Sequence, residues 1–133
     1  MIDYNPFPNV DPGLNPMGSN VLVQIRSPRL RTAGGIILAA ETRETSMWTE
    51  QIAKVLSFGP LAYKNRTNGQ DWPEGAWCSI NDLVRVPKYG GDRYSITYGD
   101  GESEIANFVI FKDTDILAKV VEGFDASKIK AYV

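Results

Sequence analysis

This sequence contains few types of side chain that can carry out acid–base, nucleophilic or metal chemistry. Its 133 residues include no histidine and a single cysteine, Cys78. Imidazole metal ligands, the usual general base near neutral pH, and Ser-His-Asp or Cys-His arrangements are therefore excluded, and one cysteine cannot build a zinc site. Acid–base chemistry by carboxylates alone stays open, but most Asp and Glu residues stand beside turns or on alternating faces, which is typical of solvated surface. We expect no enzymatic activity, no metal and no bound cofactor.

The residues that point to a function by binding are an aliphatic triplet behind two glycines. Ile36, Ile37 and Leu38 follow Gly34 and Gly35, and polar sequence without apolar periodicity lies on both sides. Such a triplet either folds inward as a short edge strand, with the glycines as a bulge, or is displayed for a partner to bury, as exposed apolar groups commonly are. The choice between these two interpretations decides what the protein does.

The composition also limits the partners and the cellular location that we expect. A formal net charge of −2 gives no general attraction to nucleic acid or to an anionic membrane, and no apolar run is long enough to span a bilayer. The first residues lack the basic and apolar regions of a secretory signal. A lone cysteine excludes an internal disulfide and suits a reducing compartment, so we expect a cytoplasmic protein without nucleic-acid or membrane partners.

Short β-strand patterns separated by turn residues recur along most of the chain. Alternating or β-branched runs bounded by Gly, Asn and Asp clusters are typical of an all-β barrel or sandwich. The last run also fits a short capped helix, although its valines favour a strand. The predicted strands cover residues 21–25, 51–58, 77–80, 83–87, 93–98, 108–111 and 116–121.

Three other segments do not read as strands. Residues 1–17 contain four prolines, which disfavour both helix and strand, so an extended arm or a disordered tail is expected. Residues 61–76 form a polar excursion with a tight turn predicted at Asn68 and Gly69. A turn is also predicted near residues 125–128.

Five segments, taken in order, resemble the GroES-type co-chaperonins, the chaperonin-10 family. Each segment is weak alone, but their order and near-correct spacing extend the resemblance over roughly residues 16–122. Asn81 stands where the family commonly has a glycine, a change that asparagine tolerates because it also adopts left-handed conformations. The five matching segments are residues 16–23, 32–38, 52–60, 82–91 and 109–120.

The resemblance implies a small irregular GroES-like β-barrel, all-β, over residues 18–122. A long mobile loop would span about 27–50 and a roof-type loop about 60–76. Residues 1–17 would be an N-terminal extension and 123–133 a C-terminal extension. In a ring these extensions would brace neighbours or line the cavity, unless they are disordered.

The resemblance also implies partners. Such proteins form rings, typically of seven subunits, that cap a GroEL-type chaperonin and enclose unfolded client proteins, while the chaperonin binds ATP. The implied chaperonin-binding residues are Gly34, Gly35, Ile36, Ile37 and Leu38. The implied contacts between subunits are Val21, Leu22, Val23, Ile116, Leu117 and Val120.

Several alternatives remain open at this stage. Met47 and Trp48 either make a second partner contact or pack where the loop rejoins the barrel, and Trp72 and Trp77 either pack together or alter the roof. The extensions suggest a divergent member, and one origin that fits them is a phage-encoded protein acting in a host cytoplasm. The rival interpretation is a ring or virion structural protein that docks a partner through the same loop. A dehydrogenase-type barrel would require zinc ligands and a nucleotide domain, which the sequence lacks.

Overall fold

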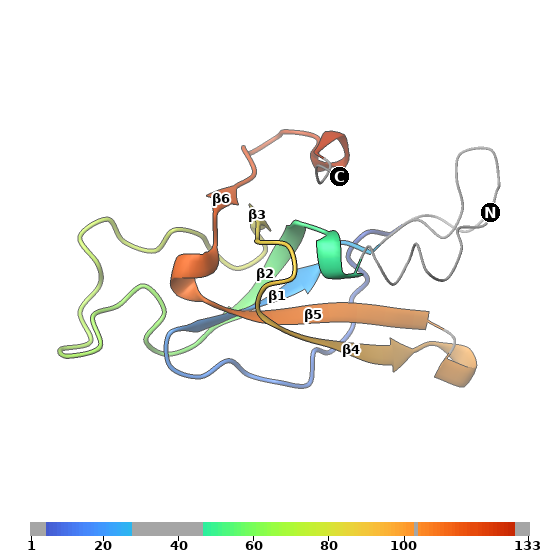
Figure 1. Cartoon of the computed structure of the whole chain (residues 1–133), viewed down its shortest axis with the longest axis horizontal. Helices are drawn as coiled ribbons and strands as arrows, with labels where there is room; N and C mark the ends of the chain where they lie inside the picture. The colour runs from blue at the N-terminus through green and yellow to red at the C-terminus, as the bar shows by residue number, and fades with distance from the viewer. Residues whose placement is uncertain (1–4, 28–46, 103, 130–133) are drawn as a thin grey trace.

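The computed structural model describes residues 5–27, 47–102 and 104–129, and regular structure in them is mostly β-strand (Figure 1). This confirms the predicted all-β class. The strands are β1 Asn20–Ile25, β2 Ile52–Phe58, β3 Leu83–Arg85, β4 Asp92–Tyr98, β5 Glu104–Lys112 and β6 Ala118–Lys119. The 3-10 turns are η1 Asp100–Glu102, η2 Asp113–Asp115 and η3 Ala126–Lys128. Within the described residues, no helix is long and apolar enough to cross a membrane.

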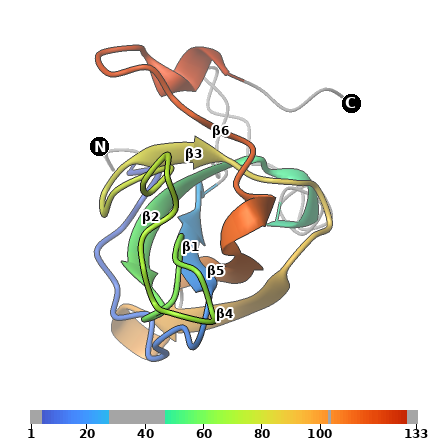
Figure 2. The ribbon, with the colours of Figure 1, turned by 90° about the vertical axis from the view of Figure 1, so that its left-hand side faces the viewer.

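The six strands form one antiparallel sheet in the order β4-β5-β1-β2-β3-β6. β1 lies at the centre, hydrogen-bonded to β2 on one side and to β5 on the other. After β5 the chain turns through η2 and reaches the opposite edge, where β6 pairs with β3. Figure 2 shows the sheet curling around its interior. β4 and β6 are therefore the two outer strands.

The concave face of the sheet carries the larger core. Val21, Val23 and Ile25 alternate along β1 and point to this side, as the two-residue period of a strand requires. The chain also contributes Tyr63 and Cys78 from outside the strands. The remaining buried members of this core are Ala53, Val55, Ala62, Val84, Val86, Val109, Phe111 and Ile116.

The N-terminal arm covers the other face of β1. Leu22 forms a second cluster with Val10 of the arm at its margin, and Gln24 donates from its side-chain amide to the Pro8 carbonyl at 2.8 Å. The Tyr94 hydroxyl donates to the Pro12 carbonyl at 2.8 Å. Residues 5–17 are therefore an extended arm packed on its own chain rather than a disordered tail.

Most predicted strands are confirmed, with changed lengths. Residues 21–25, 51–58 and 93–98 correspond closely to β1, β2 and β4, and 108–111 is the inner part of a longer β5. The segment 83–87 shortens to the three residues of β3. The segment 116–121 is extended, as favoured, but only the two residues of β6 pair as strand. The turn predicted near 125–128 is η3.

The strand predicted for residues 77–80 is wrong. The Asp82 carboxylate accepts a hydrogen bond from the Ser79 amide at 2.7 Å, and the Asp82 amide donates back to the Ser79 carbonyl at 3.1 Å. Asn81 between them adopts the left-handed conformation, with φ 74°, as its residue type allows. This reciprocal bonding folds the segment into a turn, and Ile80 is left more than half exposed.

Aromatic side chains within and beside the polar excursion, residues 61–76, hold this segment together. The ring centroids of Tyr63, Trp72 and Trp77 lie 5.4–5.5 Å apart in each pair, and Phe58 lies 6.0 Å from Tyr63. These separations are typical of favourable aromatic pairs. The packing interpretation of Trp72 and Trp77 is therefore confirmed.

The turn predicted at Asn68 and Gly69 is wider than expected. Of the two residues only Gly69 has a positive φ, 71°, and its amide donates to the Asn65 carbonyl at 2.7 Å. The side chains of Asn65 and Asn68 accept bonds from amides two residues ahead. These asparagines bond their own backbone, which is a common alternative to a two-residue hairpin turn.

Gly91 packs closely against the end of β5, and substitution of this glycine tests that packing. Its φ is +74°, and an added Cβ would lie 2.4 Å from a Val109 methyl group. Gly75 has the same φ, but an added Cβ there meets nothing within 4 Å. We expect Gly91→Ala to lower the free energy of unfolding by about 2–4 kcal/mol, from backbone strain plus overpacking. In urea unfolding, Gly75→Ala should lose only the backbone part; equal losses would contradict this packing.

Candidate functional site

The aliphatic triplet and its glycines, residues Gly34, Gly35, Ile36, Ile37 and Leu38, lie outside the described residues. What the structure does describe is the base from which this segment leaves and to which it returns. The chain departs from the end of β1 and comes back at residue 47, shortly before β2 begins. Because β1 and β2 pair with each other, the two ends of the loop meet at the same end of the sheet.

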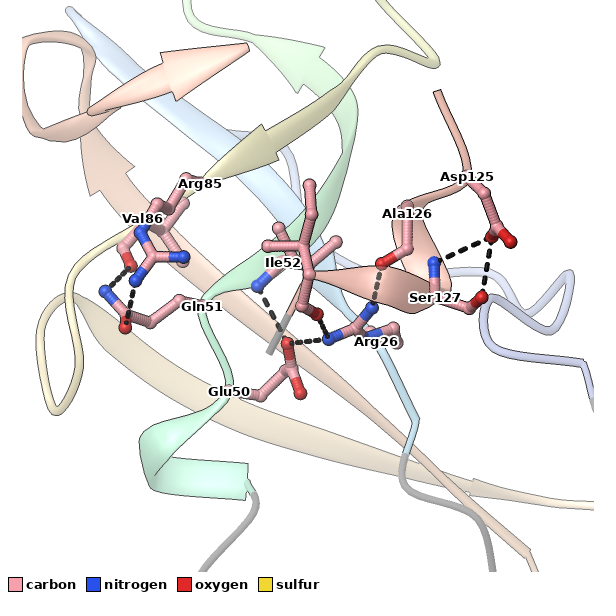
Figure 3. A network of polar contacts seen from close by, with 10 residues as sticks. Arg26, Glu50, Gln51, Ile52, Arg85, Val86, Asp125, Ala126 and Ser127 are labelled. Carbon is pink, nitrogen blue, oxygen red and sulfur yellow. Dashed lines mark hydrogen bonds and ion pairs between the residues drawn. The ribbon is translucent and has the colours of Figure 1, made fainter. Parts of the chain in front are cut away.

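One side of the base is cross-linked by an ion pair. The Arg26 amide donates to the Ile52 carbonyl at 3.0 Å, and the Arg26 guanidinium meets the Glu50 carboxylate at 2.9 Å. The same Glu50 oxygen accepts from the Ile52 amide at 2.9 Å (Figure 3). Both side chains are largely shielded, with 13% and 17% of their surface exposed. Such a sheltered, charge-assisted bond is stronger than one between exposed groups.

Arg93, at the start of β4, holds the other side. Its guanidinium donates to the carbonyls of Met47, Gly90 and Pro87 and lies 5.9 Å from the centre of the Trp48 ring, within the range of a cation–π contact. Burial lowers the pKa of Arg93, but a guanidinium remains protonated in proteins. Met47 and Trp48 thus contact the barrel where the loop rejoins it.

The predicted subunit contacts fall in two different environments. Val21, Leu22 and Val23 are fully buried, and β1 is paired on both edges within its own chain. The prediction that they pair with a neighbouring subunit does not fit this placement, because β1 has no free edge.

The other predicted contacts lie near β6, an outer strand. Ile116 is buried in the larger core, while Leu117 is 57% exposed and Val120 is half-buried. Leu117 and Val120 donate their amides to the carbonyls of Arg85 and Leu83. This segment therefore extends along β3 and leaves its other side to solvent or to another chain.

Neither a cluster of metal ligands nor a reactive cysteine is found among the described residues. Within the described ranges, no group of three or more His, Cys, Asp or Glu residues is placed to hold a metal ion. Cys78 is buried, with its sulfur 3.6 Å from the Tyr63 hydroxyl. Burial raises the pKa of the Cys78 thiol, which makes it a poor nucleophile near neutral pH.

The residues that anchor the loop base were missed in the sequence. Arg26 and Glu50 immediately flank two predicted strands, and antiparallel pairing of these strands brings the flanking positions together. Opposite charges at such positions were a usable signal. Arg93 gave no comparable signal, because its partners are backbone carbonyls.

Comparison with known proteins identifies the class to which this arrangement belongs. The family model for the chaperonin 10 kDa subunit matches residues 13–120. A co-chaperonin GroES of Methylacidiphilum infernorum (isolate V4) is 35% identical over 114 residues, covering 86% of this chain and 99% of the relative. A co-chaperonin GroES of Tetragenococcus halophilus is 30% identical over 107 residues, covering 80% of this chain and 98% of the relative.

The match therefore extends over nearly the whole length of both relatives. The chain belongs to the chaperonin 10 kDa subunit family. An identity of 30–35% makes it a divergent member.

Arg93 gives a first test of the loop base. Arg93→Lys keeps the charge but loses the fork that reaches several carbonyls, so we expect the free energy of unfolding to fall by about 1–3 kcal/mol. Exchange of the Tyr89 amide, which bonds the Trp48 carbonyl at 2.8 Å, should accelerate. Arg66→Lys, at an exposed position, is the matched control. The same result in both variants would refute an anchoring role for Arg93.

Proposed function

We propose that this protein is a co-chaperonin that forms a ring and caps a GroEL-type chaperonin in a nucleotide-dependent way, thereby assisting protein folding. The observation that carries the proposal is the family match across residues 13–120, within which the Gly-Gly-aliphatic loop leaves the centre of the sheet. The protein itself performs no bond chemistry. ATP is bound and hydrolysed by the chaperonin, and unfolded clients are enclosed beneath the ring in the cytoplasm.

Ile36, Ile37 and Leu38 are the proposed anchor, with Gly34 and Gly35 giving the backbone freedom to seat it. Burial of three large aliphatic side chains contributes roughly 1.5–3 kcal/mol each. Ordering the backbone of a loop costs roughly 1–2 kcal/mol per residue, so a single loop binds weakly. Several loops on one ring act at high effective concentration after the first contact. Weak anchors therefore combine into a cap that is tight but reversible.

The ring requires two complementary surfaces on each subunit. Large exposed apolar side chains occur on the arm, at Leu14 and Met17, and near the C-terminal end, at Leu117, Val121 and Phe124. Figures 1 and 2 both show the part of the arm that leads into β1 below the sheet and the C-terminal segment above it. Two unlike surfaces on opposite sides suit head-to-tail contacts, which close into rings. We propose that the free edge at β6 meets the arm of a second copy, which replaces β1 as the interface.

The anchor is tested by Ile37→Asp and Leu38→Asp. Desolvating a carboxylate in an apolar groove is strongly unfavourable, so we expect loss of ATP-dependent binding to a bacterial chaperonin in analytical ultracentrifugation, together with loss of assisted refolding. Ile80→Asp places the same charge at a position 54% exposed and should leave binding unchanged.

Folding and assembly of the anchor variants should match those of the unaltered protein. If the Ile37→Asp ring still joins the chaperonin with ATP, the triplet is not the anchor. A ring that ignores the chaperonin in every nucleotide state would instead favour a structural ring or virion component.

The interface is tested by Leu117→Asp. We expect the ring to dissociate into folded monomers, because a charge would be buried against the neighbour's arm. Ile105→Asp is the control, since Ile105 is equally exposed at 56% but lies in the β4–β5 hairpin. Sedimentation velocity distinguishes ring from monomer. An intact Leu117→Asp ring, or an Ile105→Asp monomer, would place the interface elsewhere.

A further inference from the structure

The C-terminal segment of this chain lies beyond the family match, which ends at residue 120, yet it folds back onto the base of the loop. Its η3 turn is closed by Asp125, whose carboxylate accepts from the Ser127 amide at 3.0 Å and from the Ser127 hydroxyl at 2.6 Å. These bonds to Ser127 lower the pKa of the Asp125 carboxyl. The turn presents the carbonyls of Ala126 and Ile129 in one direction.

Arg26 receives both carbonyls. Its Nη1 donates to the Ala126 carbonyl and its Nη2 to the Ile129 carbonyl, each at 2.7 Å. The same Nη2 meets Glu50 at 2.9 Å. Figure 3 shows the guanidinium between the η3 turn and the Glu50 carboxylate. One side chain therefore joins the start of the loop, its end and the C-terminal segment.

We propose that residues 125–129 are a strap that positions the base of the chaperonin-binding loop through Arg26. The strap carbonyls fix the guanidinium in the orientation that reaches Glu50, and the strap shields this ion pair from water. Arg26 is thus a positioning residue. The role of the strap in binding rests on the proposed function, whereas its effect on the loop base is a property of the free protein.

Shielding decides how much the ion pair contributes. An exposed Arg–Glu pair contributes little, because water screens it and both side chains lose rotamer entropy. With the strap in place, the Arg26 side chain is only 13% exposed, and the two backbone carbonyls already restrict its rotamers. A base held at fixed spacing restricts the loop before binding, so less conformational entropy is lost when the chaperonin engages it.

The first experiment measures amide exchange in the free ring. The Ile52 amide reports on the pair, because it donates to the Glu50 carboxylate. We expect its exchange to accelerate about tenfold, the equivalent of one lost charge-assisted bond, when the chain ends after Phe124 and equally in Arg26→Lys. Asp125→Ala, which opens the η3 turn in a full-length chain, should shift exchange in the same direction.

The matched control is Arg85→Lys. Arg85 donates to the side chain of Gln51 at 2.9 Å. Gln51 follows Glu50 in the chain, but this bond does not involve the strap. Its loss should leave exchange of the Ile52 amide unchanged. Ring size and thermal unfolding, measured on every variant, establish that folded rings are being compared.

The second experiment measures affinity for a bacterial chaperonin with ATP. We expect truncation after Phe124 and Arg26→Lys each to weaken binding by about threefold or more. The two changes together should weaken it no further than one alone, because Arg26 acts through the strap. A general structural role for Arg26 predicts additive effects.

The outcomes separate the two proposals. Unchanged Ile52 exchange after truncation overturns the strap and leaves the co-chaperonin function intact. Accelerated exchange with unchanged chaperonin affinity, or additive effects in the double variant, overturns the role of the strap in binding. If the Ile37→Asp ring binds normally, the proposed loop function fails, while the exchange results on the free ring still stand.

Discussion

The complete enclosure of β1 is the constraint on which the rest of this structure depends. Its backbone is paired on both edges by β2 and β5, and Val21, Leu22 and Val23 are fully buried. A strand flanked on both edges and covered on both faces needs two separate cores. The curled sheet supplies one core, and the N-terminal arm closes the other.

In the proposed function, this enclosure directs both chaperonin binding and ring assembly to other parts of the chain. The loop leaves from the end of β1, so its base is fixed to the most buried strand of the molecule. Assembly, in contrast, must use outer surfaces, because β1 has no edge left to offer. Exposed apolar side chains at Met17 and Val121 lie on the two segments that reach beyond the sheet.

Much of this fold could be predicted from local sequence patterns. The alternation in residues 51–58 and 93–98 reports the side-chain period of a strand, which local sequence encodes directly. The segment 77–80 misled because Trp77 and Cys78 pack against Tyr63, whereas Asp82 folds the backbone into a turn that leaves Ile80 exposed. Strand order is not local either, so nothing in residues 21–25 indicated a central rather than an outer strand.

The candidate site likewise combines a part that local sequence reveals with a part that depends on long-range contacts. The triplet Ile36, Ile37 and Leu38 is conspicuous in sequence because apolar residues there have no periodic neighbours. The base that carries it depends on contacts between positions about one hundred residues apart, as between Arg26 and the Ile129 carbonyl. Such long-range bonds to backbone carbonyls leave no residue-type signature at the accepting position. In the proposed function, the strongly held base limits the conformational entropy that is lost on binding, and the glycines of the loop keep each contact weak enough to release.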